Sequence, residues 1–330
     1  MASDNCYIAG DIGGTKTNLG CFLAGRQRPR RLCSASFPSQ QFSDLETILT
    51  QFMTRAPEHP VAGACFGIAG PVVGGLSRTT NLPWIVSENA IQERFRWPRV
   101  RLINDLVATA MAVPVLHSRE MVSVNPNRVQ HSENLALVAP GTGLGLALIV
   151  SHNGQRIPVA SEGGHGGFSP EEDEEVALWE YLHAIYGHVS TERVLSGQGL
   201  VNIYQWLKDS GRYREPQWLA EAGAKGDPAK AISDAAMMRK TPIAVAALKR
   251  FVSILGAVSG DFALTGMAFR GVYLGGGIPP RIQSAIMNGP FQEAFTRKGR
   301  FKPMLEKTAV RIILNDRAAL LGAAIGAIDA

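Results

Sequence analysis

The stretch CYIAGDIGGTKTNLGCFLA, residues 6–24, sets the architecture of this chain. Its two apolar segments, 6–10 and 17–24, have the composition of short β-strands, and the residues between them include Gly13 and Gly14. Because glycine tolerates the backbone angles of a tight turn, we predict a strand, a glycine loop and a returning strand.

The loop ends in Lys16-Thr17 after glycines and therefore resembles a Walker phosphate-binding loop. It departs from that motif twice: Thr15 precedes the lysine where the motif requires glycine, and the residues that follow read as a strand where a helix is needed. We therefore reject a Walker loop.

A second stretch, LALVAPGTGLGLALIV at 135–150, has the same layout and indicates an internal duplication. The segment GTGLG at 141–145 also resembles a dinucleotide-binding fingerprint, with Glu162 about 20 residues further on. However, Leu146 occupies the last Gly/Ala position of that fingerprint, and another strand follows. A nicotinamide-dependent oxidoreductase stays an alternative.

The rest of the chain alternates between strand and helix patterns. We expect helices at 42–55, 105–113, 170–186, 190–208, 216–222, 242–267 and 316–328, and strands at 61–69, 100–103, 271–274 and 309–314. This alternation indicates an α/β protein with a mostly parallel sheet. With 330 residues, two domains are expected, and 114–134, rich in Pro, Asn, Ser and His, is the candidate boundary.

Composition excludes several protein classes. Hydrophobic residues make up 45% and charged residues 18%, which rules out a disordered chain. A net charge of +5 is too small to indicate nucleic-acid binding. Every long apolar run is interrupted before about 18 residues, and no basic segment precedes one at the start, so we expect a cytoplasmic protein without a membrane partner. The cysteines, Cys6, Cys21, Cys33 and Cys65, lack metal-site spacing and are expected to be reduced and mostly buried.

Three charged features have simple structural explanations. The acidic run 171–175 fits the start of a helix with Ser169 as N-cap and Pro170 at N1, which we favour over an acidic docking patch. The arginines of 26–31 fit a solvated hairpin tip, which we favour over an anion-binding patch. The apolar helix at 242–267 carries internal charges, so we predict a core helix and not a membrane span.

Both glycine loops can direct backbone N–H groups at an anion, with the Thr15 and Thr142 hydroxyls as further donors. An ordinary glycine hairpin is the alternative for either loop alone. Two such loops suit a polyphosphate. A carboxylate beside phosphates, such as Asp11, needs Mg²⁺ to be favourable.

Asn104 and Asp105 follow the strand at 100–103, at the sheet edge where α/β proteins place their chemistry. Phosphoryl transfer to an alcohol needs a base for the hydroxyl proton, and Asp105 suits that role. Helix capping by these two residues is the alternative.

Three further polar residues, Asn81, Glu162 and His165, lie in loop-forming sequence and together suit a polyol ligand. Glu192 lies at the head of a helix-like run that closes in 196–199. Glu192 has the alternative of an ordinary surface glutamate. A lone histidine such as His165 is more often structural than a metal ligand, and no cysteine follows it.

The ordered series of motifs resembles that of the bacterial glucokinases, which are hexose kinases of the actin, sugar-kinase and heat-shock ATPase superfamily. The series is DIGGTKTN (11–18), GIAGP (67–71), TNLPW (80–84), IND (103–105), GTGLG (141–145), EGGH (162–165), ERVLSGQGL (192–200) and GGGI (275–278). The resemblance runs the length of the chain. One departure is that residues 166–330 lack the cysteines of the zinc motif found in related repressors and kinases, so no structural zinc is expected.

The resemblance implies a two-domain actin-like ATPase (ribonuclease H-like) fold of the α/β class. Residues 1–115 plus 306–330 would form a smaller α/β domain and 116–305 a larger α+β domain. An interdomain cleft would close over the sugar, and the protein would be a homodimer.

The resemblance also implies roles for single residues. Asp105 would be the base for the 6-hydroxyl, and Asp11 would place Mg²⁺ indirectly. The implied sugar-binding residues are Asn81, Asn104, Asp105, Glu162, His165 and Glu192. The implied nucleotide-binding residues are Asp11, Gly13, Gly14, Thr15, Lys16, Thr142, Gly143, Gly275, Gly276 and Gly277.

The activity implied is phosphorylation of glucose to glucose 6-phosphate with ATP and Mg²⁺. A non-catalytic sugar-sensing regulator of the same fold and a kinase for another hexose are the alternatives. ADP and polyphosphate stay open as phosphoryl donors.

Overall fold

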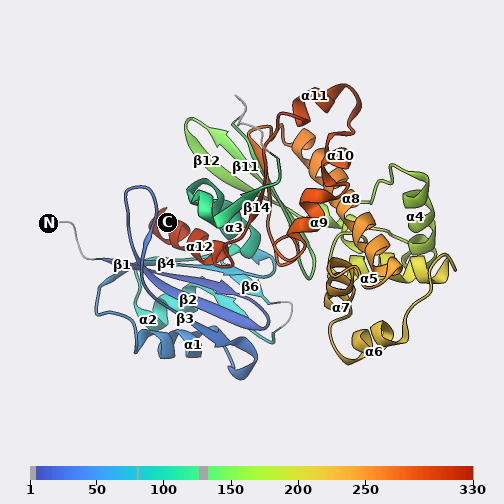
Figure 1. Cartoon of the computed structure of the whole chain (residues 1–330). Coiled ribbons are helices and arrows are strands. Elements are labelled where there is room, and N and C mark those ends of the chain that lie inside the picture. Colours follow the sequence, from blue (N-terminus) through green and yellow to red (C-terminus); the bar gives the residue numbers. More distant parts are fainter. Residues whose placement is uncertain (1–4, 80–81, 126–132, 330) are drawn as a thin grey trace. The chain divides into compact units, whose positions relative to one another are not determined.

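The computed structural model describes residues 5–79, 82–125 and 133–329 (Figure 1). Contacts divide the chain into two compact units. The first consists of Met1–Ser118, His152–Ala160 and Asn315–Ala330, and the second of Arg119–Ser151 and Ser161–Leu314.

The first unit is built on a five-stranded sheet in the order β3-β2-β1-β4-β8. Its strands are β1 (Cys6–Ile12), β2 (Lys16–Leu23), β3 (Arg30–Pro38), β4 (Val61–Ile68) and β8 (Val100–Asn104). β2 runs antiparallel to its neighbours β1 and β3, whereas β4 and β8 run parallel to β1. The predicted strand, glycine loop and returning strand are therefore confirmed. The predicted hairpin tip at 26–31 is confirmed for 26–29, whereas Arg30 and Arg31 belong to β3.

Helices cover both faces of this sheet (Figure 1). α1 (Leu45–Met53) and α2 (Glu88–Phe95) pack on one face around residues such as Ile8 and Phe66. α3 (Asp105–Ala112) and α12 (Ala318–Asp329) pack on the other face. A small three-stranded sheet completes the unit; it consists of β5 (Val72–Val73), β6 (Leu76–Arg78) and β7 (Ile85–Ser87).

The second sheet has the order β12-β11-β10-β13-β14-β9. Its strands are β9 (Met121–Ser123), β10 (Leu135–Pro140), β11 (Leu144–His152), β12 (Gln155–Ser161), β13 (Gly271–Leu274) and β14 (Val310–Ile313). β10 and β11 form an antiparallel hairpin, and β13 and β14 run parallel to β10. The first sheet has the same succession, which supports the predicted duplication.

Most helices of the second unit gather around α8 (Pro242–Thr265). The others are α4 (Asp173–Tyr186), α5 (Gly197–Asp209), α6 (Gln217–Lys225), α7 (Pro228–Met237), α9 (Gln283–Asn288), α10 (Phe291–Thr296) and α11 (Lys302–Leu305). α8 is long and apolar enough to cross a membrane, but 72% of its most apolar window is buried inside the protein. The predicted core helix is confirmed.

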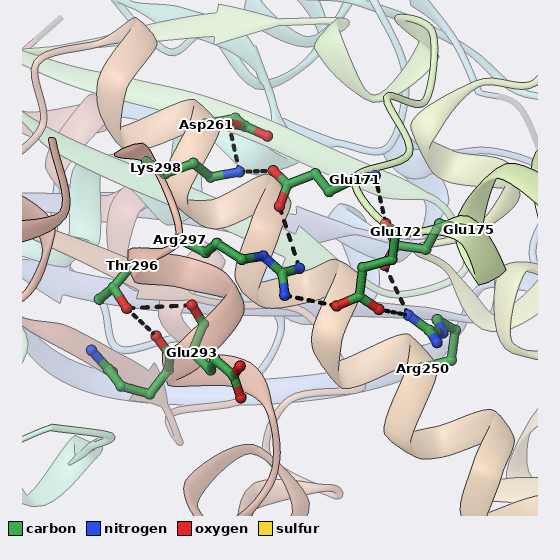
Figure 2. Close-up of polar contacts among 10 residues, drawn as sticks. Glu171, Glu172, Glu175, Arg250, Asp261, Glu293, Thr296, Arg297 and Lys298 are labelled. Atoms are coloured by element: carbon green, nitrogen blue, oxygen red, sulfur yellow. Dashed lines mark hydrogen bonds and ion pairs between the residues drawn. The ribbon is translucent and has the colours of Figure 1, made fainter. Parts of the chain in front are cut away.

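The predicted start of α4 is wrong. The helix begins at Asp173, and its N-cap is Glu172, with no side-chain cap, instead of Ser169. Figure 2 shows that Glu171 and Glu172 point toward cations of α8 and of the chain after α10. Glu172 contacts Arg250 and Arg297, and Glu171 contacts Lys298. These ion pairs hold the two glutamates ahead of the helix.

The limits of the units also differ from the predicted domain boundaries. The segment after 306 contains β14, which pairs with β13 inside the second sheet. It therefore groups with the second unit up to Leu314. The candidate boundary at 114–134 does contain one change of unit, after Ser118.

Candidate active site

In the first unit, three parallel strands bring the predicted residues to one sheet edge. Asp11 pairs in register with Gly67 of β4, and Ile68 pairs with Asn104 of β8. Because the carboxyl ends of parallel strands share an edge, Asp11 and the Asn104-Asp105 pair lie at the same end of this sheet.

The loop between β1 and β2 is held in place by Ser39, a residue that the sequence analysis did not identify. Ser39 is fully buried; its Oγ donates to the Gly13 carbonyl at 2.8 Å and lies 2.9 Å from the Thr17 hydroxyl. Its backbone N–H donates to the Thr15 carbonyl at 3.0 Å. These bonds fix the loop while Thr15 and Lys16 stay exposed and Gly13 and Gly14 half-buried.

Asp11 is a half-buried carboxylate beside this loop. Burial raises its pKa, and this effect outweighs the lowering by the Asn18 amide and by the charge of Lys16. Asn18 Nδ2 donates to Asp11 Oδ2 at 3.2 Å. A carboxylate whose charged form is disfavoured by burial would gain from a nearby cation, so these residues fit a Mg²⁺ ion that accompanies phosphates.

Asn104 has the capping role that was the alternative explanation. Its Oδ1 accepts from Leu106 N at 2.9 Å and from Val107 N at 3.4 Å, at the start of α3. Its Nδ2 donates to the Gly70 carbonyl at 3.2 Å, which ties α3 to the segment after β4. The side chain of Asn104 thus fixes the start of α3 against the segment after β4.

Asp105 is the first residue of α3 and is half-buried, and its Oδ1 accepts from Leu106 N at 2.8 Å. The helix approaches β4 closely because Gly67 has no side chain. A Cβ there would lie 3.0 Å from Ala108 Cβ and 3.5 Å from Asp105 Cα. Gly67 therefore allows Asp105 to reach the edge that carries Asp11.

Asn81 lies outside the described residues. On either side of it, Thr79 Oγ1 donates to the Leu82 carbonyl at 2.8 Å and Trp84 Nε1 donates to the Phe42 carbonyl at 3.2 Å. These bonds anchor the described residues on either side of Asn81 within the first unit.

In the second unit, the turn that contains Thr142 and Gly143 joins β10 to β11. Gly141 N donates to the Gly143 carbonyl at 2.8 Å, which closes the turn. Glu192 Oε2 accepts from Leu144 N at 2.8 Å, so this predicted sugar ligand contacts the backbone next to the turn.

Glu162 and His165 flank the same turn. They lie at the short 3-10 helix Gly163–His165, with exposed side chains whose Oε2 and Nε2 are 3.9 Å apart. Gly164 makes the approach possible, since a Cβ there would lie 2.3 Å from the Leu144 carbonyl oxygen. The 3-10 helix that carries His165 and follows Glu162 therefore lies against Leu144, the residue whose N–H bonds to Glu192.

The glycine run after β13 lies beside this turn as well. Gly276 has a φ of +78°, and a Cβ there would lie 2.4 Å from the Pro140 carbonyl oxygen, so only glycine fits. Gly275 N donates to the Val138 carbonyl at 2.9 Å. Gly277 borders the cavity described next.

A cavity of about 510 Å³ opens in the second unit next to Thr142 and Gly277. Its lining is Gly141, Thr142, Gly197, Gln198, Leu200, Val201, Asp227, Pro228, Ala229, Lys230, Ser233, Gly277, Ile278, Arg281 and Ile282. The first turns of α5 and α7 border it, and helix N-termini favour anions. Its volume lies in the range of small-molecule sites.

Sequence reasoning missed most of this lining, including Gln198, Lys230 and Arg281. One available signal was Asp227-Pro228, an N-cap followed by proline at N1, which marks the start of α7. That signal predicts a helix start but not which helix starts border one cavity.

Comparison with known proteins gives a consistent result. The family model described as Glucokinase matches residues 8–330. A glucokinase of Nostoc sp. (strain PCC 7120) is 36% identical over 335 residues, which cover 96% of this chain and 97% of that protein. The crystal structure of a glucokinase from an Antarctic psychrotroph superposes with a TM-score of 0.89 at 29% identity and covers 99% of both chains.

A ROK family glucokinase from Streptomyces griseus, solved in complex with glucose and AMPPNP, shares the fold with a TM-score of 0.65 at 21% identity, covering 99% of this chain and 100% of that one. The fold is thus the expected two-domain actin-like α/β fold. On the family model and the full-length identity to curated relatives, the chain belongs to the glucokinase family of sugar-phosphorylating enzymes.

Proposed function

We propose that this enzyme transfers the γ-phosphoryl group of ATP to the 6-hydroxyl of glucose, with Asp105 as the general base. The observation that carries the proposal is the position of Asp105 at the first residue of α3, on the sheet edge that also carries Asp11. The names of its relatives and the complex of the Streptomyces griseus enzyme with glucose and AMPPNP support the choice of substrates.

In the proposed reaction the sugar O6 attacks the γ-phosphorus and its proton passes to the Asp105 carboxylate. The bond between the γ-phosphorus and the bridging oxygen breaks, and ADP leaves with that electron pair. Such a transfer depends on positioning and on neutralisation of charge more than on covalent catalysis. Mg²⁺ bound with ATP would supply part of that neutralisation, and Asp11 would help to hold it.

The remaining predicted residues form two groups, one that would bind the sugar and one that would bind the nucleotide. Amide, carboxylate and imidazole groups can pair with sugar hydroxyls, each of which both donates and accepts. We assign Asn81, Asn104, Glu162, His165 and Glu192 to this group. The glycine loops at 13–16 and 142–143 would bind phosphates, and the cavity beside Gly275–Gly277 would hold the adenosine.

The test is Asp105→Asn, with Glu93→Gln as the control. Glu93 is an exposed carboxylate of α2 in the same unit, so its variant makes the same change of charge away from the site. We expect Asp105→Asn to lower kcat by about 100-fold or more, as loss of a general base does, while calorimetry still detects glucose binding. Near-normal turnover in this variant would refute the assignment.

A hexose panel with ATP and Mg²⁺ tests the substrate. ADP release with glucose only would support the proposed activity. Faster ADP release with another hexose would favour a kinase for that hexose. No ADP release with any hexose would favour the non-catalytic regulator. Replacement of ATP by ADP or polyphosphate in the same assay tests the donor.

We also propose that the enzyme is a cytoplasmic homodimer, as the family resemblance implies. Sedimentation velocity at micromolar concentration measures the mass directly. A sedimenting species of monomer mass across that range would refute the dimer.

A further inference from the structure

Glu192 makes a contact that a sugar ligand does not require. It lies in the 3-10 helix Thr191–Arg193, and its Oε2 accepts a hydrogen bond from Leu144 N at 2.8 Å. Leu144 is the first residue of β11, directly after the turn that carries Thr142 and Gly143. The turn is shaped to receive this carboxylate, because a Cβ at Gly143 would lie 2.5 Å from Glu192 Oε2.

A second tie joins the same segment to the other side of the turn. Gly197 N donates to the Gly141 carbonyl at 2.8 Å, and both residues line the 510 Å³ cavity. Between the two ties, Ser196 Oγ donates to the Glu192 carbonyl at 2.8 Å and accepts from Gly199 N at 3.0 Å, which caps α5. The residues from 192 to 199 therefore form one braced segment along the turn.

The Glu192 side chain can therefore link the binding of the sugar to the binding of the nucleotide. A hydrogen bond from a backbone N–H to a carboxylate is stronger than one between neutral groups. A sugar hydroxyl that donates to Glu192 restricts the rotamers of this side chain, and the bond to Leu144 then costs less side-chain entropy. By linkage, nucleotide binding at the turn favours sugar binding by the same factor.

We infer that Glu192 is a positioning residue that holds the 141–144 turn and thereby couples sugar binding to nucleotide binding. The sugar arm of this inference rests on the proposed function. The nucleotide arm rests on the contact between Glu192 and Leu144 and on the cavity lining.

Glu162 is the matched control. It is also a predicted sugar ligand, but its side chain is 80% exposed, and its carboxylate lies 3.9 Å from His165 Nε2. Glu162→Ala should weaken glucose binding without changing nucleotide affinity in the sugar-free protein. Two conservative variants separate charge from reach: Glu192→Gln keeps an oxygen near Leu144, whereas Glu192→Asp keeps the charge but is one methylene shorter.

The experiment is calorimetric titration of the full chain with AMPPNP and Mg²⁺, first without sugar and then with saturating glucose. In the unmodified protein, glucose should tighten AMPPNP binding about 5-fold or more. Glu192→Ala should weaken sugar-free AMPPNP binding by about 10-fold, as expected for loss of a hydrogen bond to a charged group, and should abolish the coupling. Glu192→Gln should recover part of the sugar-free affinity, because its amide oxygen can accept the same but weaker hydrogen bond from Leu144 N, and Glu192→Asp should recover none.

Three results would each overturn the inference: no coupling in the unmodified protein, sugar-free AMPPNP affinity unchanged in Glu192→Ala, or an equal loss in Glu162→Ala. If Glu192→Ala does not fold, the comparison of Glu192→Asp with Glu192→Gln decides. Because binding is measured without turnover, coupled binding in a chain that releases no ADP would refute the proposed function and leave this inference standing.

Discussion

Gly322 of α12 lies so close to α3 that an added Cβ would be 1.6 Å from the carbonyl oxygen of Ala108. No side chain other than hydrogen can occupy this position without moving one of the two helices. α3 is the helix that begins with Asp105, so the packing of the carboxy-terminal helix helps to position the proposed base.

We therefore expect Gly322→Ala to destabilise the first unit by about 2–3 kcal/mol, the upper range for overpacking of a core. Urea denaturation measures the loss. Gly223→Ala in α6 is the control, because a Cβ there meets Pro228 at an ordinary 3.6 Å and alanine is the better helix former. Equal stability of the Gly322 variant and the unmodified chain would contradict this packing.

Ser39 should matter to nucleotide binding although it is fully buried under the first loop. Ser39→Ala removes the hydrogen bond to the Gly13 carbonyl and the contact with Thr17. We expect a stability loss of about 1–2 kcal/mol and a KM for ATP raised several-fold, with the KM for glucose little changed. A double-mutant cycle with Thr17→Val measures the interaction free energy between the two hydroxyls. Strictly additive losses of stability would show that the hydroxyls act independently.

Asp11 should lower the free energy of unfolding as pH rises. Burial raises its pKa in the folded protein, so ionisation is easier in the unfolded chain. The unmodified protein should therefore lose stability relative to Asp11→Asn as pH rises from about 4, the ordinary Asp pKa, through the raised pKa. Thermal unfolding at pH 4 and pH 7 without Mg²⁺ tests this.

The same variant should need more Mg²⁺ for half-maximal activity if Asp11 helps to hold the ion. A titration of activity with Mg²⁺ measures the requirement. An unchanged Mg²⁺ requirement would remove Asp11 from the metal site while leaving the stability prediction unaffected.

Glu172 should show the opposite pH dependence. The Arg250 hydrogen bond, followed by contacts with Arg297, lowers the pKa of Glu172 in the folded protein. Its contribution is therefore present above the ordinary Glu pKa of about 4.3 and is lost as pH falls through the lowered value. The difference in unfolding free energy between the unmodified chain and Glu172→Gln should be constant above pH 5 and shrink below it.

Urea denaturation at pH 7 and pH 3.5 measures this difference. Glu180→Gln is the control, because Glu180 is an exposed residue of α4, the helix that follows Glu172. If Glu180→Gln shows the same pH dependence as Glu172→Gln, the ion pairs in Figure 2 are not its source.

Local sequence signals were sufficient for much of the fold. The two glycine loops were predicted at 11–16 and 141–145 between returning strands; they lie between antiparallel strands and span 13–15 and 141–143. The strand at 271–274 and the helix that begins at Asp105 were also predicted with the correct start. These features depend on glycine conformation and on apolar patterns, which act between residues close in sequence.

Contacts between distant residues decided the remainder. The helix predicted to begin at Pro170 begins at Asp173 instead, because the glutamates before it form ion pairs with cations located about 80 to 125 residues further along the chain. The support of the turn at 141–144 by Glu192, and of the first loop by Ser39, likewise joins segments that no local pattern relates. The sequence by itself determined which loops and strands form and which residue types they present. Tertiary structure alone decided which carboxylate faces which backbone N–H, because that depends on packing of elements that only the folded chain brings into contact.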